Sequence, residues 1–227
     1  MNSNTRIIYF LIISGVLHLN FLFGQSLDPL TNPNYRIDTV LKHFPYFDKY
    51  YGIAAVGSLP LSNREFINSP SVRGIKFMYR ELLNEKLSAG FDFNYSGYKD
   101  YTEPRVYPTG NGAVFTDYFG YVDQYSITMS GEYLFSPDKK LIPYAGFGGG
   151  ASYTSFRLYY NVYQNSERKW SGMVRPYAGA ILRFGNKTSW GAFTTLSFDH
   201  SFVKAPDFDY KGLASVNLQI GLVYLNW

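Results

Sequence analysis

The sequence has no cysteine, which excludes a disulfide scaffold, thiolate metal ligands, a cysteine nucleophile and a lipid anchored through cysteine. Histidine is also scarce: there are three, and His18 lies in the leader described below. With two histidines left in the mature chain, we expect no histidine-based metal site and no cofactor. The formal net charge of +4 is too small to indicate nucleic-acid binding.

Long apolar runs are missing after the first 25 residues, so no later segment resembles a spanning helix. Residues 1–25 combine Arg6 with an apolar run from Ile7 to Leu17 and a small-residue stretch around Gly24, the order of a secretory signal peptide. The run is shorter than the roughly 20 residues of a spanning helix. The alternative is an uncleaved N-terminal anchor. Cleavage would remove only Arg6 among the charged residues.

Aromatic residues are abundant, at 19% of the chain, although the mean hydropathy is only −0.17. Strands favour aromatic side chains, and membrane interfaces collect them. Segments such as 87–95, 125–135 and 214–224 alternate apolar and polar residues with a period of two, as strands with two different faces do. Eight segments are expected as strands: 50–59, 71–80, 86–97, 118–135, 141–156, 170–184, 189–201 and 211–226.

The connections between these segments alternate in length. Residues 81–85, 136–140 and 185–188 predict tight turns, whereas 60–70, 98–117, 157–169 and 202–210 predict long loops. This layout is typical of a transmembrane barrel, in which a sheet must close because unpaired backbone groups are costly in hydrocarbon. We therefore expect an all-β protein: an eight-stranded antiparallel up-and-down transmembrane β-barrel over 50–227. Because the number of strands is even, both chain ends are expected on the short-turn side. Residues 26–49 are expected as a periplasmic segment, either a linker or a short amphipathic helix near Ile37 to Phe44.

The alternation predicts which face meets lipid. The apolar face is expected outside, and its lipid-facing residues are Leu87, Phe91, Phe93, Ile127, Met129, Val216, Leu218, Ile220 and Leu222. A secreted soluble barrel of lipocalin type would show the reverse, with a polar outside and an apolar centre.

Three features resemble a known family. Pro143-Tyr-Ala-Gly146 recurs as Pro176-Tyr-Ala-Gly179, and the chain ends in an aromatic segment, residues 219–227. With the leader and the eight segments, these are similar to the small outer-membrane β-barrel proteins of Bacteroidota, which are distantly like OmpA and OmpX barrels. The resemblance implies location in the outer membrane after signal-peptide cleavage. It also implies insertion by the barrel-assembly machinery, which would read the C-terminal residues Gln219, Gly221, Tyr224 and Trp227.

Charged residues occupy the face expected inside. They are Lys76, Arg80, Asp92, Glu132, Arg175, Arg183 and Asp199. Arg80, Glu132 and Arg183 are each near a short turn, so we expect them to approach one another at the periplasmic end. Because eight strands leave little interior space, we favour a salt-bridged plug over a narrow pore for ions or small solutes.

Catalytic motifs are weak. Asp199-His200-Ser201 contains the residue types of a lipid A acyl-modifying enzyme, but neighbours on a strand point to opposite faces, so His200 cannot readily activate Ser201. Gly146 to Gly150 resembles a phosphate-binding loop but lacks the lysine and a following helix. We expect no enzyme and no catalytic residue. The favoured role is structural, adhesive or in envelope assembly, with outer-membrane lipid as one partner and an envelope protein contacted through 98–117 and 157–169 as another.

Overall fold

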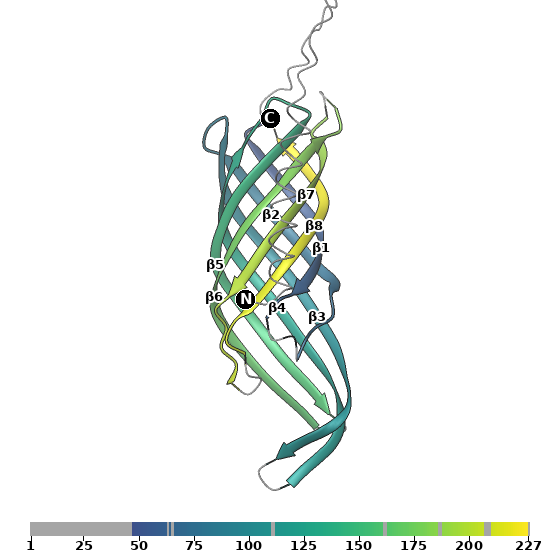
Figure 1. Cartoon of the computed structure of the whole chain (residues 1–227). Coiled ribbons are helices and arrows are strands. Elements are labelled where there is room, and N and C mark those ends of the chain that lie inside the picture. The colour runs from purple at the N-terminus through teal and green to yellow at the C-terminus, as the bar shows by residue number, and fades with distance from the viewer. Residues whose placement is uncertain are drawn as a thin grey trace, which may run out of the picture. The chain divides into compact units, whose positions relative to one another are not determined.

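The barrel is formed by eight antiparallel strands, each paired with its neighbours in chain order (Figure 1). This computed structural model describes residues 47–62, 64, 66–109, 112–160, 163–185, 188–206 and 210–226. The strands are β1 (Lys49–Pro60), β2 (Ser71–Leu82), β3 (Leu87–Thr109), β4 (Gly112–Leu134), β5 (Leu141–Tyr160), β6 (Tyr163–Arg183), β7 (Trp190–Ser201) and β8 (Leu213–Asn226). Each of the eight predicted segments contributes one strand.

Closure joins the first strand to the last. Lys49, the first residue of β1, pairs with Glu81 of β2 and with Asn226 of β8. The start of β1 and the end of β8 therefore both lie at the end of the barrel that carries the short turns, as predicted. Because β1 and β8 pair along their length, the wall of the barrel closes on itself, which removes the cost of unpaired backbone groups within the wall. Among the described residues, no helix has the length and apolar character needed to cross a membrane.

Burial alternates along the strands with the predicted period. In β7, for example, the pattern switches between buried and exposed at nearly every residue. Phe91, Ile127 and Leu218 face outward, with 55%, 60% and 49% of their surfaces exposed. Their sequence neighbours Asp92, Thr128 and Gln219 are buried inside. The charged face lines the centre and the apolar face covers the outside.

Two segments predicted as loops are largely strand instead. The β3–β4 hairpin pairs as far as Thr109 opposite Gly112, and the β5–β6 hairpin pairs as far as Tyr160 opposite Tyr163. Residues 98–117 and 157–169 therefore extend the hairpins past the other strands, at the lower end of Figure 1. The extensions remain strands because each arm keeps its partner in the same hairpin, so the backbone groups that face the other arm stay paired beyond the barrel.

The repeated Pro-Tyr-Ala-Gly sequence has a packing role. β5 and β6 pair so that Tyr144 lies opposite Gly179 and Gly146 lies opposite Tyr177. A Cβ atom at either glycine would overlap the ring of the facing tyrosine. Each copy of the motif thus supplies a ring for the other copy's glycine, an arrangement that fills the wall where a glycine leaves space.

The N-terminal predictions lie outside the described residues. These are the signal peptide at 1–25 and most of the periplasmic segment at 26–49, including the possible helix. Of that segment, Phe47 and Asp48 precede β1, and the Asp48 amide donates to the Asn226 carbonyl over 2.9 Å.

Candidate functional site

Side chains fill the barrel interior in three layers. Apolar clusters occupy the short-turn end and the loop end, and a layer of charged and hydroxyl side chains lies between them. We refer to these as the short-turn cluster, the loop-end cluster and the charged middle layer. The sequence predicted the charged layer but not the two clusters that enclose it.

The short-turn cluster closes the end at which the chain enters and leaves the barrel. Phe47, just before β1, packs edge-on against Tyr50, with 5.5 Å between ring centroids. The other members come from β1, β2 and β4 to β8: Ala54, Met78, Leu134, Ile142, Tyr144, Tyr177, Ile181, Phe193, Val223 and Leu225. None of these side chains is more than 7% exposed, so this end of the lumen is packed as a protein core.

The loop-end cluster is built partly by loops that fold inward. Phe66 and Ile67 come from the β1–β2 loop, and Tyr210 comes from the β7–β8 loop. The Tyr210 ring lies 4.6 Å from that of Phe156 and 5.8 Å from that of Phe66. Tyr98, Tyr118, Val122, Val203, Ala205 and Leu213 complete the cluster. Sequence reasoning missed these loop residues because a loop has no periodicity to indicate which side chains turn inward.

Asp92 is the centre of one half of the charged middle layer. Arg80 Nη2 lies 2.9 Å and 3.0 Å from its two carboxylate oxygens, and Lys76 Nζ lies 3.5 Å from Oδ1. Ser130 donates to Oδ2 over 2.8 Å. Arg80 also contacts Glu132, with 3.3 Å between Nε and Oε2, and Tyr177 donates to the same oxygen over 3.0 Å. Each carboxylate is therefore in contact with a cation and a hydroxyl donor despite its burial, although the second oxygen of Glu132, Oε1, has no hydrogen-bond partner.

Arg175 and Asp199 form the other half. A path of hydrogen bonds joins the halves: Lys76 donates to Gln219 over 3.0 Å, and Gln219 donates to Ser197 over 3.1 Å. Ser197 in turn donates to Asp199 over 3.1 Å. The layer thus contains three basic and three acidic side chains, equal in number across the lumen.

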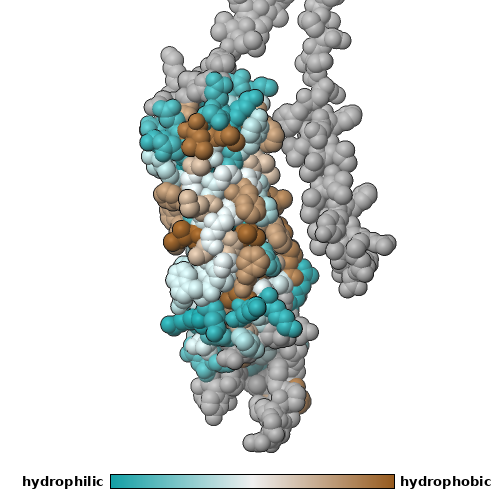
Figure 2. Space-filling model, turned by 90° about the vertical axis from the view of Figure 1, so that its left-hand side faces the viewer, coloured by the Kyte–Doolittle hydropathy of each residue, from teal (hydrophilic) through white to brown (hydrophobic). Residues whose placement is uncertain are grey.

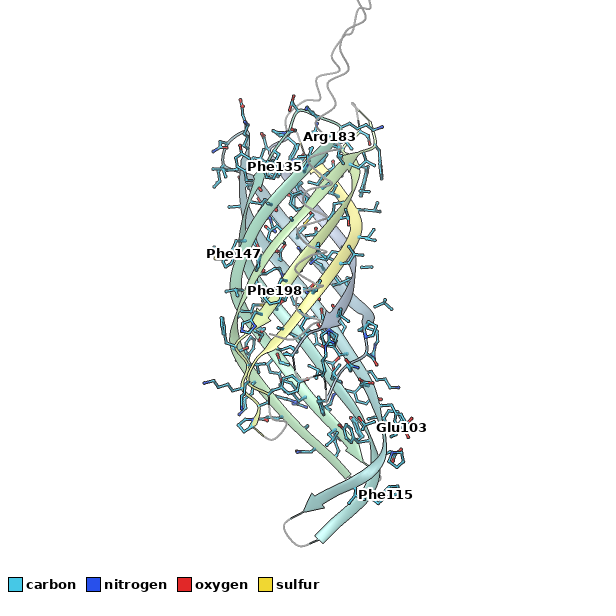
Figure 3. All side chains as sticks on the ribbon, in the orientation of Figure 1. Glu103, Phe115, Phe135, Phe147, Arg183 and Phe198 are labelled. Carbon is cyan, nitrogen blue, oxygen red and sulfur yellow. The ribbon has the colours of Figure 1, made fainter. Side chains whose placement is uncertain are left out.

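Six of the seven predicted lumen residues contact one another in this way, and all seven are 0–4% exposed. Arg183 is placed elsewhere. Its Nη2 donates to the Pro137 carbonyl over 2.8 Å, and its guanidinium lies 4.9 Å from the ring of Phe47. It therefore lies at the short-turn end (Figure 3). The predicted three-way approach is corrected: Arg80 and Glu132 meet in the middle layer, beyond the apolar cluster that contacts Arg183.

His200 and Ser201 lie on opposite faces of β7. Ser201 is buried, and its hydroxyl bonds those of Ser152 and Ser171 over 2.8 Å and 2.7 Å. The His200 ring packs on the outside against Phe202, with centroids 4.8 Å apart. In this structure the imidazole is not positioned to take a proton from Ser201. The described residues also contain no cluster of three side chains suited to hold a metal ion.

The predicted lipid-facing residues lie on the outer wall. Eight of them are 40–78% exposed, and Val216 is partly exposed. On the face drawn in Figure 2, apolar side chains occupy a band between two hydrophilic zones. Phe147 and Phe198, labelled in Figure 3, belong to the same outer surface and are 56% and 40% exposed.

The predicted assembly-signal residues have structural contacts in β8. Gln219 belongs to the charged middle layer, and a Cβ atom at Gly221 would overlap the Ile53 carbonyl. Tyr224 faces outward against Trp190, with ring centroids 5.3 Å apart. Trp227 lies outside the described residues. Recognition by an assembly machine stays a prediction.

No protein-family model matches the sequence, and no curated protein matches it. Several solved structures are similar. Ail, the attachment invasion locus protein of Yersinia pestis, is 13% identical, with 80% of this chain and 99% of that chain covered and a TM-score of 0.49. Neisserial surface protein A is 17% identical, with 78% and 96% covered and a TM-score of 0.47. The N-terminal β-barrel domain of OprF from Pseudomonas aeruginosa is 15% identical, with 79% and 100% covered and a TM-score of 0.40. At this identity the likeness does not extend to function.

Proposed function

We propose that the protein spans the bacterial outer membrane as a sealed, non-conducting barrel and has a non-enzymatic structural, adhesive or envelope-assembly role. In this proposal its β3–β4 and β5–β6 hairpins contact partners outside the cell. The observation that carries the proposal is the combination of an apolar outer wall with a lumen filled by side chains in all three layers.

The outer wall supports membrane placement. Met129, Ile220 and Ile127 are 78%, 61% and 60% exposed, and many large apolar side chains share their face. A continuous apolar surface of this kind is costly in water and favourable in lipid. It argues against the soluble lipocalin alternative. Export through a cleaved signal peptide, and the origin in Bacteroidota, stay predictions from the sequence.

The filled lumen supports the plug over the pore. A conducting path would have to pass the short-turn cluster, the charged middle layer and the loop-end cluster. In the middle layer each carboxylate is already bonded to a cation. An ion entering this layer would have to displace a buried partner, which leaves an uncompensated charge.

The extended hairpins support a role outside the membrane. β3 and β4 continue past the wall, and their outer parts carry exposed side chains such as Glu103 and Phe115 (Figure 3). Paired strands present such side chains on a firmer support than an irregular loop does, which lowers the entropy lost on binding. An envelope protein contacted through these hairpins stays a proposal.

Planar-bilayer conductance of the purified full-length chain, combined with fractionation of the cells, tests this function. We expect the protein in the outer-membrane fraction and no current steps over prolonged recording. A porin added afterwards to the same bilayer checks that steps are detectable. Reproducible steps from the purified chain would replace the plug with the pore, and recovery in a soluble fraction would remove membrane placement.

A further inference from the structure

A cleft on the outside of the barrel, near its loop end, combines cations with aromatic rings. It has a volume of about 490 Å³ and is lined by Arg73 of β2, Phe119 and Tyr121 of β4, and Arg157 and Tyr159 of β5. These residues belong to the outward face of the wall. The cleft therefore opens sideways, away from the barrel centre.

In the proposed membrane placement, a row of aromatic side chains on the barrel side of this cleft lies at the membrane boundary. Tyr95, Tyr125, Tyr153 and Trp170 lie on four adjacent strands, with successive ring centroids 4.9, 6.5 and 5.1 Å apart. Tyrosine and tryptophan collect where hydrocarbon meets headgroups. From Tyr125 to Tyr121 the strand advances four residues toward the loops. At about 3.3 Å per residue and a tilt of about 40°, this places the cleft about 10 Å beyond the row, at headgroup depth.

The cleft has an excess of positive charge. Lys99 adds a third cation to Arg73 and Arg157, because its Nζ lies 5.3 Å from the ring of Phe119 and 5.6 Å from that of Tyr121. The guanidinium of Arg157 lies 5.7 Å from the Tyr121 ring. The nearby carboxylate of Asp123 is bonded by Arg157 and, through its other oxygen, by Tyr95 over 2.8 Å.

Asp123 therefore orients Arg157 and ties the cleft to the aromatic row. The three cations outnumber the two carboxylates on this part of the wall, Asp123 and Asp117, and Asp117 accepts from the Tyr101 hydroxyl over 3.1 Å, so the cleft attracts an anion. Arginine suits a phosphate because its planar donors match two phosphate oxygens at once.

We propose that this cleft binds the phosphate group of an outer-leaflet glycolipid headgroup, an inference that rests on the proposed membrane placement. Arg73 and Arg157 donate to the phosphate oxygens, and Lys99 adds charge. The faces of Phe119, Tyr121 and Tyr159 provide an apolar surface for the adjoining sugar ring. A lipid is favoured over a soluble phosphosugar because the cleft opens into the headgroup layer and not at the hairpin tip.

Lipid titration into nanodiscs tests the proposal. The full-length protein is placed in phosphatidylcholine nanodiscs, and binding of bisphosphorylated lipid A is compared with binding of the same lipid after its phosphates are removed. We expect the phosphorylated lipid to bind at least tenfold more tightly, and the double variant Arg73→Gln/Lys99→Gln to lose most of that preference. A matched control, Lys204→Gln/Lys211→Gln, removes two exposed cations from the β7–β8 loop region and should bind as the unmodified chain does.

Three results would overturn the inference: equal binding of the two lipids, equal weakening in the two double variants, or displacement of the lipid by millimolar inorganic phosphate, which would indicate a general anion site. Fractionation of the same variants separates this failure from failure of the proposed function. A variant that reaches the outer membrane and folds, yet binds lipid A normally, contradicts the cleft alone. An unmodified chain absent from the outer membrane contradicts the placement itself.

Discussion

Arg175 and Asp199 form a two-point ion pair inside the barrel, with 2.8 Å between Nε and Oδ1 and 2.6 Å between Nη2 and Oδ2. Asp199 comes from β7 and Arg175 from the adjacent strand β6, and neither side chain is more than 4% exposed. The parallel geometry of the two bonds is the strong form of this interaction. A buried pair of this kind makes each partner dependent on the other.

Replacing one partner should therefore cost more than replacing both. We expect Arg175→Gln to lower the free energy of unfolding by about 3–5 kcal/mol, because Asp199 keeps a buried charge without its main partner. The double variant Arg175→Leu/Asp199→Leu should recover much of that loss, since no charge is left in the layer at this point. Urea titration in phosphatidylcholine vesicles measures both.

The exposed pair of Lys49 and Glu81, 3.4 Å apart, provides the control for this prediction. Lys49→Gln should change the unfolding midpoint little, because water already solvates both partners. If Arg175→Gln were as mild as Lys49→Gln, the buried ion pair would not contribute to stability as the geometry implies.

Gly146 and Gly149 lie on one strand but differ in the space around them. A Cβ at Gly146 would lie 2.6 Å from both the Tyr177 ring and the Gly131 carbonyl, whereas at Gly149 the nearest atom is 3.9 Å away. Gly146→Ala should thus displace Tyr177 from Glu132 and cost about 1–3 kcal/mol. Gly149→Ala should stay within about 0.5 kcal/mol of the unmodified protein. Similar midpoints for both variants would contradict the paired tyrosine–glycine packing.

Side-chain parity made much of the fold predictable. Phe91 and Asp92, or Leu218 and Gln219, face opposite ways because a strand alternates its sides regardless of what lies around it. The strand number and the position of the short turns followed from the same pattern. The hairpin extensions were harder to predict from the sequence. Beyond the wall of the barrel, residues 98–117 and 157–169 contain polar and aromatic residues on both faces.

The apolar clusters were harder to predict, although the sequence contains a partial signal. Near the short turns both faces become apolar, as in Tyr133-Leu134-Phe135 and Leu222-Val223-Tyr224-Leu225. Such runs indicate an apolar interior as well as an apolar exterior. At the loop end, by contrast, Phe66 and Tyr210 reach the lumen through contacts that depend on how two loops fold together. No local pattern encodes that arrangement.

The outer wall provides a direct test of the surrounding medium. Ile127 lies outward on β4 and is 60% exposed, so Ile127→Arg would place a charge in hydrocarbon if lipid covers the wall. We expect a loss of about 2–4 kcal/mol in the free energy of unfolding in vesicles. Leu83→Arg, in the β2–β3 turn where Leu83 is 70% exposed, should have little effect because the turn lies at the rim. Equal, small effects would indicate that water, not lipid, surrounds Ile127.

Asp100 of β3 accepts hydrogen bonds from the β1–β2 loop at the loop end of the barrel. Replacing Asp100 should therefore destabilise the closed position of that loop alone. Its carboxylate accepts from the Asn68 amide over 2.6 Å, the Ser69 amide over 3.1 Å and the Ser69 hydroxyl over 2.9 Å. Bonds to a charged acceptor contribute about 1.5–3 kcal/mol each, so Asp100→Ala should raise the population of the open loop at least tenfold. Opening exposes Phe66, which is only 8% exposed in the closed state, and chymotrypsin cleavage there should accelerate in proportion.

Ser69→Ala removes a single bond and should give a smaller increase, while the heat-modifiable migration of the barrel should be the same in all forms. Unchanged cleavage at Phe66 in Asp100→Ala would mean that the ring is retained by its packing against Tyr118 and Tyr210 and not by the carboxylate.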